Sequence, residues 1–196
     1  RYRYPSLLAY YAFDGSQAWT REALTPARLA RHLVDKPRGV CPINPGSSLT
    51  RVAVLDLDSH GGETPWDEMT RVAAQIADAL ALLGLYAQAF RSTGGRGIHL
   101  YLLWDGPQDA RSVRLMLADV LAGCGLRPGT RGVSRGEVEV FPKQNAVPGD
   151  GFGSQFILPL AGQSVPLGVG APTRSQRLAA AGYRRRPTHR SIPEDE

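Results

Sequence analysis

A short apolar run that contains two aspartates constrains this chain more than any other feature. Residues 52–58 read Val-Ala-Val-Leu-Asp-Leu-Asp, and their aliphatic, β-branched content predicts a buried strand. Residues two apart on a strand point to the same side, so Asp56 and Asp58 are expected on one face, roughly 6.6 Å apart. A charge among apolar side chains is costly unless it is compensated. We therefore interpret the pair as candidate metal ligands, the alternative being two acids at a strand end that cap a helix or face solvent.

The elements around this strand predict an α+β fold. Between residues 66 and 83, apolar side chains recur at three- and four-residue steps, which is typical of one helix face. Further strands and one more helix are predicted, in chain order, at 85–91, 98–104, 107–122 (the helix), 137–142 and 155–160. The order strand-helix-strand-strand-helix-strand, followed by one more strand, is the split βαβ arrangement of ferredoxin-like and RNA-recognition-motif-like (RRM-like) folds. That arrangement carries many functions, so it does not name an activity.

Three regions are expected along the chain. Residues 1–50 form a small N-terminal helical lobe and loop within the same unit, with helices over 4–14 and 25–35, and Pro26 at the first position of the second helix. Residues 51–165 form the core. Residues 166–196 are rich in Gly, Pro and Arg and are interpreted as a basic tail or linker.

Composition narrows the class of partner and the compartment. The chain of 196 residues has a net charge of +5 and a pI of about 9.6, which suits a polyanion. No apolar run approaches the roughly 18 residues that a membrane span needs. Cys41 and Cys124 have no second ligand at metal-binding spacing, which indicates a reducing, cytoplasmic setting. The first residue is Arg1 rather than Met, and we expect a fragment of a longer protein.

A third acid is expected from the segment Gly-Glu-Val-Glu-Val-Phe-Pro at residues 136–142. Glu137 and Glu139 alternate with apolar residues and would share one face of a strand. Either could complete a cage of three carboxylates with Asp56 and Asp58. We favour Glu139 and keep Glu137 as the alternative third acid; a polar, solvent-facing edge strand would also explain both.

Phosphate-binding groups are expected beside the glycine-rich turn at residues 92–97. His99 begins the strand after this turn, and glycines let backbone N–H groups approach phosphate oxygens. Ser92, Arg96 and Gly97 of the turn are further candidates for binding a nucleotide. Lys143, one of only two lysines in a chain dominated by Arg, is another candidate for contact with a nucleotide phosphate. A structural histidine and a solvated loop lysine are the alternative interpretations.

Taken together, these segments resemble the archaeo-eukaryotic primase superfamily, in particular the primase-polymerases of phage, plasmid and mobile-element replication proteins. The resemblance covers roughly residues 40–160 and depends on the order of three short motifs. They are Val-Leu-Asp-Leu-Asp ending at Asp58, Gly-Ile-His ending at His99, and Val-Glu-Val-Phe-Pro-Lys-Gln around Glu139.

The resemblance implies a primase-polymerase that carries out template-directed nucleotidyl transfer from an NTP or dNTP to a 3′-hydroxyl. It implies that Asp56, Asp58 and Glu139 are catalytic residues that hold two Mg²⁺ or Mn²⁺ ions, and that His99 binds the triphosphate. The expected partners are a single-stranded DNA template, a primer, and additional helicase or primase C-terminal domains in the full-length protein.

Two other classes fit parts of the pattern. A haloacid-dehalogenase-like (HAD-like) phosphatase also has an apolar strand ending in Asp-x-Asp, but it needs a longer parallel sheet and usually continues with Gly-Thr, where this chain has Ser59 and His60. A non-catalytic RRM-like module shares the strand order and would stack bases on an aromatic side chain such as Tyr101. In that case the three acids would repel the nucleic acid.

Overall fold

Two sheets and three α-helices form the part of the chain that the computed structural model describes, residues 9–11, 24–34 and 37–169. The helices are α1 (Pro26–Val34), α2 (Trp66–Leu82) and α3 (Ala110–Gly123), with two 3₁₀ turns, η1 (His60–Gly62) and η2 (Val133–Arg135). The strands are β1 (Ala9–Tyr11), β2 (Arg38–Val40), β3 (Leu49–Leu57), β4 (Gln88–Arg91), β5 (Ile98–Asp109), β6 (Arg127–Pro128), β7 (Glu137–Phe141) and β8 (Phe156–Ile157).

The larger sheet has five strands in the order β4-β5-β3-β7-β6. Strand β3 lies in the middle and pairs antiparallel with β5 on one side and with β7 on the other. Leaving out the short edge strand β6, the elements β3-α2-β4-β5-α3-β7 and their spatial order are those of a split βαβ unit. The prediction of an α+β, ferredoxin-like core is confirmed.

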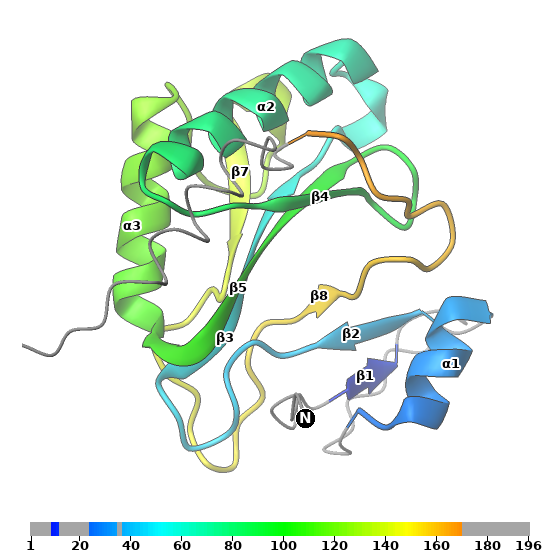
Figure 1. Ribbon diagram of the computed structural model, residues 1–196, viewed down its shortest axis with the longest axis vertical. Coiled ribbons are helices and arrows are strands. Elements are labelled where there is room, and N and C mark those ends of the chain that lie inside the picture. Colours follow the sequence, from blue (N-terminus) through cyan, green and yellow to red (C-terminus); the bar gives the residue numbers. More distant parts are fainter. Residues whose placement is uncertain (1–8, 12–23, 35–36, 170–196) are drawn as a thin grey trace, which may run out of the picture.

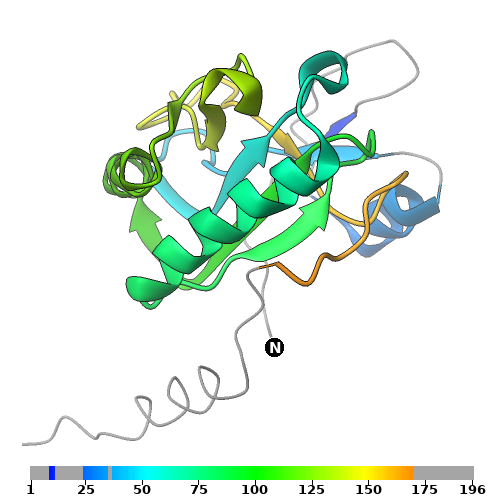
Figure 2. The same ribbon diagram turned by 90° about the horizontal axis from the view of Figure 1, so that it is seen from above.

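The two faces of this sheet have different coverings (Figure 1). Helices α2 and α3 lie over one face; Figure 2 shows α2 running across the sheet while α3 is seen nearly along its axis. Alternate residues of β3 enter the core beneath these helices: Ala53, Leu55 and Leu57 pack in one buried cluster with Ile76 of α2 and Leu117 of α3. Because side chains alternate along a strand, Val52, Val54 and Asp56 point to the other face.

The second sheet covers part of that other face. It has three strands in the order β1-β2-β8. Its Val40 and Phe156 pack with Val54, Tyr101 and Phe141 of the larger sheet in a second buried cluster. The clustered side chains join the two sheets, and Asp56 follows Val54 on the same face of β3.

The N-terminal lobe differs from the prediction. Helix α1 confirms the helix predicted over 25–35, and the Thr25 hydroxyl accepts a hydrogen bond from the Arg28 N–H at 3.3 Å as its N-cap. The helix predicted over 4–14 is wrong at Ala9–Tyr11, which form β1, and the rest of that segment lies outside the described residues. The loop predicted over 36–50 contains β2, which pairs with β1 and β8. Such pairing is a long-range property that short-range periodicity does not reveal.

The tail predicted from residue 166 is described only as far as residue 169. The chain on both sides of residue 166 lies along the edge strand β4: Arg91 N–H donates to the Val165 carbonyl at 2.9 Å, and Leu167 N–H donates to the Ala89 carbonyl at 2.8 Å. None of the described helices combines the length and the apolar character that a membrane crossing requires.

Candidate active site

Asp56 lies between two chemically active neighbours on the open face of the larger sheet. In the strand register it is directly opposite His99 on β5 and directly opposite Glu139 on β7. Antiparallel partners have their Cβ atoms about 4.5–5.5 Å apart and point to the same face. The sheet therefore brings together three residues that come from segments far apart in the sequence.

His99 is buried between Asp56 and Tyr101. Its Nε2 lies 3.2 Å from Asp56 Oδ1, and its Nδ1 lies 3.0 Å from the Tyr101 hydroxyl, which donates to the Ile157 carbonyl at 2.8 Å. Because the hydroxyl proton of Tyr101 is committed to Ile157, Nδ1 of His99 is the donor to Tyr101, and Nε2 needs its own proton to face Asp56. Burial works against the charged ring, but the carboxylate of Asp56 raises the pKa of His99 above its ordinary value.

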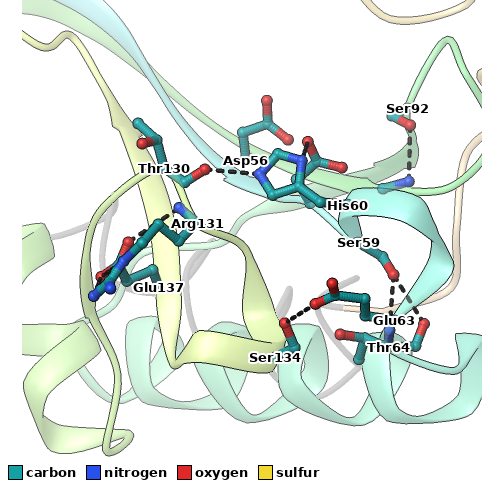
Figure 3. Close-up of polar contacts among 12 residues, drawn as sticks. Asp56, Ser59, His60, Glu63, Thr64, Ser92, Thr130, Arg131, Ser134 and Glu137 are labelled. Atoms are coloured by element: carbon teal, nitrogen blue, oxygen red, sulfur yellow. Dashed lines mark hydrogen bonds and ion pairs between the residues drawn. The ribbon is translucent and has the colours of Figure 1, made fainter.

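Asp58, at the end of β3, has a histidine partner of its own. Its Oδ2 lies 3.1 Å from Nδ1 of His60, and Nε2 of that ring donates to the Thr130 carbonyl at 2.7 Å (Figure 3). The Thr130 carbonyl, and then the Asp58 carboxylate, raise the pKa of His60. Sequence reasoning missed His60 as a site residue; its position two residues after Asp58 was the available signal.

Glu139 is paired with Lys143, whose Nζ contacts Glu139 Oε1. The loop that carries Lys143 is held by the Ser154 hydroxyl, which accepts from the Lys143 N–H at 3.0 Å and donates to Gln144 Oε1 at 2.7 Å. Lys143 Nζ also lies 5.0 Å from the centre of the Phe141 ring, within the range of a cation–π contact. These contacts hold the ammonium group over the end of β7.

Each of the three predicted metal ligands thus faces one basic side chain. The pairs are Asp56 with His99, Asp58 with His60, and Glu139 with Lys143. The donors fit divalent cations by type, because carboxylate oxygens are the ligands that Mg²⁺ and Mn²⁺ prefer. In the described ranges, no three His, Cys, Asp or Glu side chains lie close enough together to hold a metal ion. In this arrangement the protein's own basic side chains compensate the acids.

Glu137, the alternative third acid, has other partners. Its carboxylate accepts hydrogen bonds from Arg127 at 2.9 Å and from the side chain and backbone of Arg131, and Figure 3 shows it directed toward Arg131 and away from Asp56. The hydrogen bonds from Arg131 and then Arg127 lower its pKa to about 2. The carboxylate fills the space beside Gly129, where an added Cβ would lie 2.3 Å from Glu137 Oε2. These contacts make Glu137 a link between β7 and the loop after β6.

The predicted glycine turn joins β4 to β5 as a hairpin. Ser92 N–H donates to the Gly97 carbonyl at 2.8 Å, and Gly97 N–H donates to the Ser92 hydroxyl at 2.9 Å. A Cβ on Gly97 would lie 2.7 Å from the Leu57 carbonyl oxygen, so the close approach of the turn to the end of β3 requires glycine there. The turn is thereby fixed next to Asp58.

Two cavities meet at the glycine turn, since Ser92 and Gly94 line both of them. The larger, about 640 Å³, is lined by Asp56, Glu139, His99, Lys143, Ser92 and residues of β8. The smaller, about 280 Å³, is lined by Asp58, His60, Ser92, Arg96, Gly97 and neighbouring glycines. All five residues predicted to bind a nucleotide therefore line one or both cavities beside the acids.

The geometry argues against both alternative classes. A HAD-like phosphatase would need a parallel sheet around its aspartates, whereas β3 pairs antiparallel with both neighbours. An RRM-like module would need an accessible aromatic face, whereas Tyr101 is 4% exposed and contacts the Phe90 and Phe156 rings. The sheet therefore lacks the parallel pairing that a HAD-like phosphatase requires, and Tyr101 is not exposed for stacking with a base.

Comparison with known proteins gave a matching family and similar solved structures. The model of the family described as "TOTE conflict system, Archaeo-Eukaryotic Primase domain" matches residues 12–169. Among curated proteins there was no match. A similar solved structure is the polymerase domain from Mycobacterium tuberculosis Ligase D in complex with DNA, which is 22% identical with a TM-score of 0.48. The similarity covers 80% of this chain and 59% of that one.

Proposed function

Because the chain belongs to the archaeo-eukaryotic primase domain family of TOTE conflict systems, a family of primase/polymerase-type nucleotidyltransferases, we propose that it is a DNA primase-polymerase catalytic domain. It transfers a nucleotidyl group from an NTP or dNTP to a 3′-hydroxyl, directed by a DNA template. The observation that carries this proposal is the register of the sheet, which sets Asp56 directly opposite both His99 and Glu139 beside a cavity of about 640 Å³. A cavity of that size is in the range of small-molecule sites.

The proposed reaction forms one phosphorus–oxygen bond and breaks another. The 3′-hydroxyl oxygen of the primer attacks the α-phosphate of the nucleotide and its proton passes to solvent, while the bond from the α-phosphate to the β-phosphate oxygen breaks and pyrophosphate leaves. Asp56, Asp58 and Glu139 would hold Mg²⁺ or Mn²⁺, which supplies activation of the hydroxyl and stabilisation of the charge on the phosphates.

The basic residues of the site have a separate role. His99 and Lys143 line the same cavity as Asp56 and Glu139, the acids with which they are paired. When these two carboxylates bind metal ions instead, the N–H groups of His99 and Lys143 would be available to phosphate oxygens. Arg96, Ser92 and Gly97 line the adjoining cavity and would contact the triphosphate from the glycine turn. Basic groups on both sides of the acids favour the polyanionic triphosphate of the nucleotide over its base.

The partners of this activity are a single-stranded DNA template, a primer and nucleotides, with further domains in the full-length protein. The net charge of +5 supports a polyanionic partner. We place the reaction in the cytoplasm, and the free thiols of Cys41 and Cys124 suit a reducing compartment.

A primer-extension assay tests the proposal. The chain is incubated with a primer–template, one NTP or dNTP at a time, and Mg²⁺ or Mn²⁺. We expect extension only with the nucleotide that the template base specifies, and no extension by Asp58→Asn. Absence of extension under all these conditions, or extension that ignores the template base, would contradict the proposed function.

A further inference from the structure

A third cavity lies between α3 and the edge of β7, next to the site but not used by the proposed chemistry. Its volume is about 380 Å³. The residues around it come from α3, from the segment that starts at β6, and from β7 and its following loop. We call this cavity the α3 groove.

One stripe of α3 forms a wall of the groove. Arg111, Arg114, Leu115 and Ala118 are spaced by three, four and seven residues from the first, which places them on one side of a helix. The opposite side of α3 supplies Val113, Leu117 and other residues to the core. None of the buried core residues of α3 belongs to the groove-facing stripe.

The groove is positively charged. Its lining includes Arg111, Arg114 and Lys143 and one acid, Glu139, which is paired with Lys143. Outside the lining, the carboxylate of Asp109 at the N-cap of α3 also interacts with Arg111, which still leaves the basic groups in excess. Arg114 donates to the Asn145 side-chain oxygen, a neutral partner, so that contact leaves its charge uncompensated. Two guanidinium groups beside apolar Leu115 and Val140 suit a strand with regularly spaced phosphates and partly apolar sugars.

The groove also adjoins the candidate active site. Glu139 and Lys143 line both the α3 groove and the 640 Å³ cavity that contains Asp56 and His99. A strand that lies along α3 and ends at these two residues would bring its terminus beside the acids. The attacking group of the proposed reaction, a 3′-hydroxyl, is such a terminus.

From these contacts we propose that the α3 groove binds the phosphate backbone of the primer strand and directs its 3′ end to Glu139. This inference rests on the proposed function, and it assigns Arg111 and Arg114 as primer-binding residues. Neither was among the candidates from the sequence, because basic residues on a helix face are usually solvated rather than functional.

The first test is equilibrium binding of a fluorescent primer–template with a recessed 3′ end, measured by anisotropy at several salt concentrations. Arg111→Ala/Arg114→Ala should bind it at least about tenfold more weakly, and the slope of log K against log salt should fall by about 1.8, since each phosphate contact contributes about 0.9. Arg71→Ala is the matched control, because Arg71 lies on α2 and is paired with Glu68. Its DNA affinity should stay within about twofold of wild type, as expected for a surface pair of small energy.

Nucleotide binding separates this inference from the proposed function. Affinity for a dNTP with Mn²⁺ should be the same in Arg111→Ala/Arg114→Ala and in wild type. If wild type extends primers while the double variant keeps full DNA affinity and salt slope, the groove assignment is wrong and the function stands. If the double variant loses DNA affinity but wild type never extends a primer, the groove stands and the function is wrong.

Crosslinking identifies the strand. A photoreactive 4-thiothymidine is placed next to the 3′ end of the primer or, in a second substrate, at the facing positions of the template. Crosslinks from the primer to peptides of α3, Ala110–Gly123, are expected. Crosslinks to α3 from the template alone would overturn the assignment to the primer.

Discussion

The two faces of the larger sheet have different compositions although they are built from the same strands. On β3, the residues beneath the helices are Ala53, Leu55 and Leu57, all fully buried. The residues between and after them on the open face include Asp56 and Asp58, whose carboxylates face histidines. One face is closed by two helices, and the other is only partly covered by the three-stranded sheet and opens into cavities. The comparison indicates that alternate residues of β3 have different roles: those on the helix-covered face stabilise the fold, and those on the open face form the candidate active site.

A similar division separates two neighbouring acids of β7. Glu139 is opposite Asp56 and lines the cavity, while Glu137, one strand repeat away, is held by Arg127 and Arg131. An acid on the open face of the sheet is therefore not always part of the site. Glu137 is bound by two arginines, whereas Glu139 is paired with a single lysine that it could exchange for a metal ion.

Substituting these two acids should give the largest difference in primer-extension activity between two variants. Glu139→Gln is expected to lower primer extension by more than about 100-fold, since even outer-shell partners of metal ligands are worth about 10- to 100-fold. Glu137→Gln should keep most of the activity per folded molecule. Rates measured under single-turnover conditions, with circular dichroism as the check on folding, test the contrast; equal losses would remove the distinction between the two acids.

On the helix-covered face, the expected effect is on stability instead. Ile76 of α2 is fully buried beneath the sheet. Ile76→Ala should lower the free energy of unfolding by about 2–5 kcal/mol, the usual cost of such a cavity. Urea unfolding measures this loss, and the activity of the fraction that remains folded should match wild type. A selective loss of activity at full stability would contradict the division between the faces.

His99 should have an intermediate effect that is specific for the nucleotide. His99→Ala removes a buried ring that lies 3.2 Å from Asp56 and lines the larger cavity. We expect dNTP affinity to fall by about 10- to 100-fold, because a hydrogen bond to a charged group is worth about 1.5–3 kcal/mol. Affinity for single-stranded DNA should change little. Titrations of both ligands on the same variant test this, and unchanged dNTP affinity would remove His99 from the nucleotide site.

The smallest expected effect is the pH dependence of stability from Glu137. Its pKa falls from 4.5 to about 2 in the folded chain, so the carboxylate stabilises the fold fully above pH 4.5 and loses this contribution as the pH falls toward 2. The advantage of wild type over Glu137→Gln in urea unfolding should therefore shrink across that window. A constant difference between the two proteins would mean that the ion pairs with Arg127 and Arg131 do not stabilise the fold.

Local patterns in the sequence predicted the larger sheet well, because apolar periodicity and the glycine turn are properties of contiguous residues. The ends of α2, marked by Pro65 and Gly84, were also predictable. The strand pairing of β1, β2 and β8 was not, since strands of two or three residues carry too little pattern. Asp56 and Asp58 were expected on one face from spacing alone, and the register adds that His99 and Glu139 are the direct neighbours of Asp56.

The basic partners of the acids were predicted less well. Lys143 was chosen as a phosphate contact, but its pairing with Glu139 depends on the path of a loop that Ser154 holds. His60 was passed over because it stands in a turn after β3, where periodicity gives no orientation. The side of a loop or turn residue is set by tertiary contacts such as the one to Thr130, which no local pattern contains.

Asp56→Asn tests the central claim most directly, because the substitution changes one charge on the open face and leaves the helix-covered face intact. Single-turnover nucleotide incorporation and urea unfolding are measured on the same preparation. We predict that incorporation is abolished while the free energy of unfolding changes by less than about 3 kcal/mol, the upper value for one hydrogen bond to a charged group. Undiminished incorporation, or a loss of activity that only follows a loss of folded protein, would contradict the assignment of chemistry to this face.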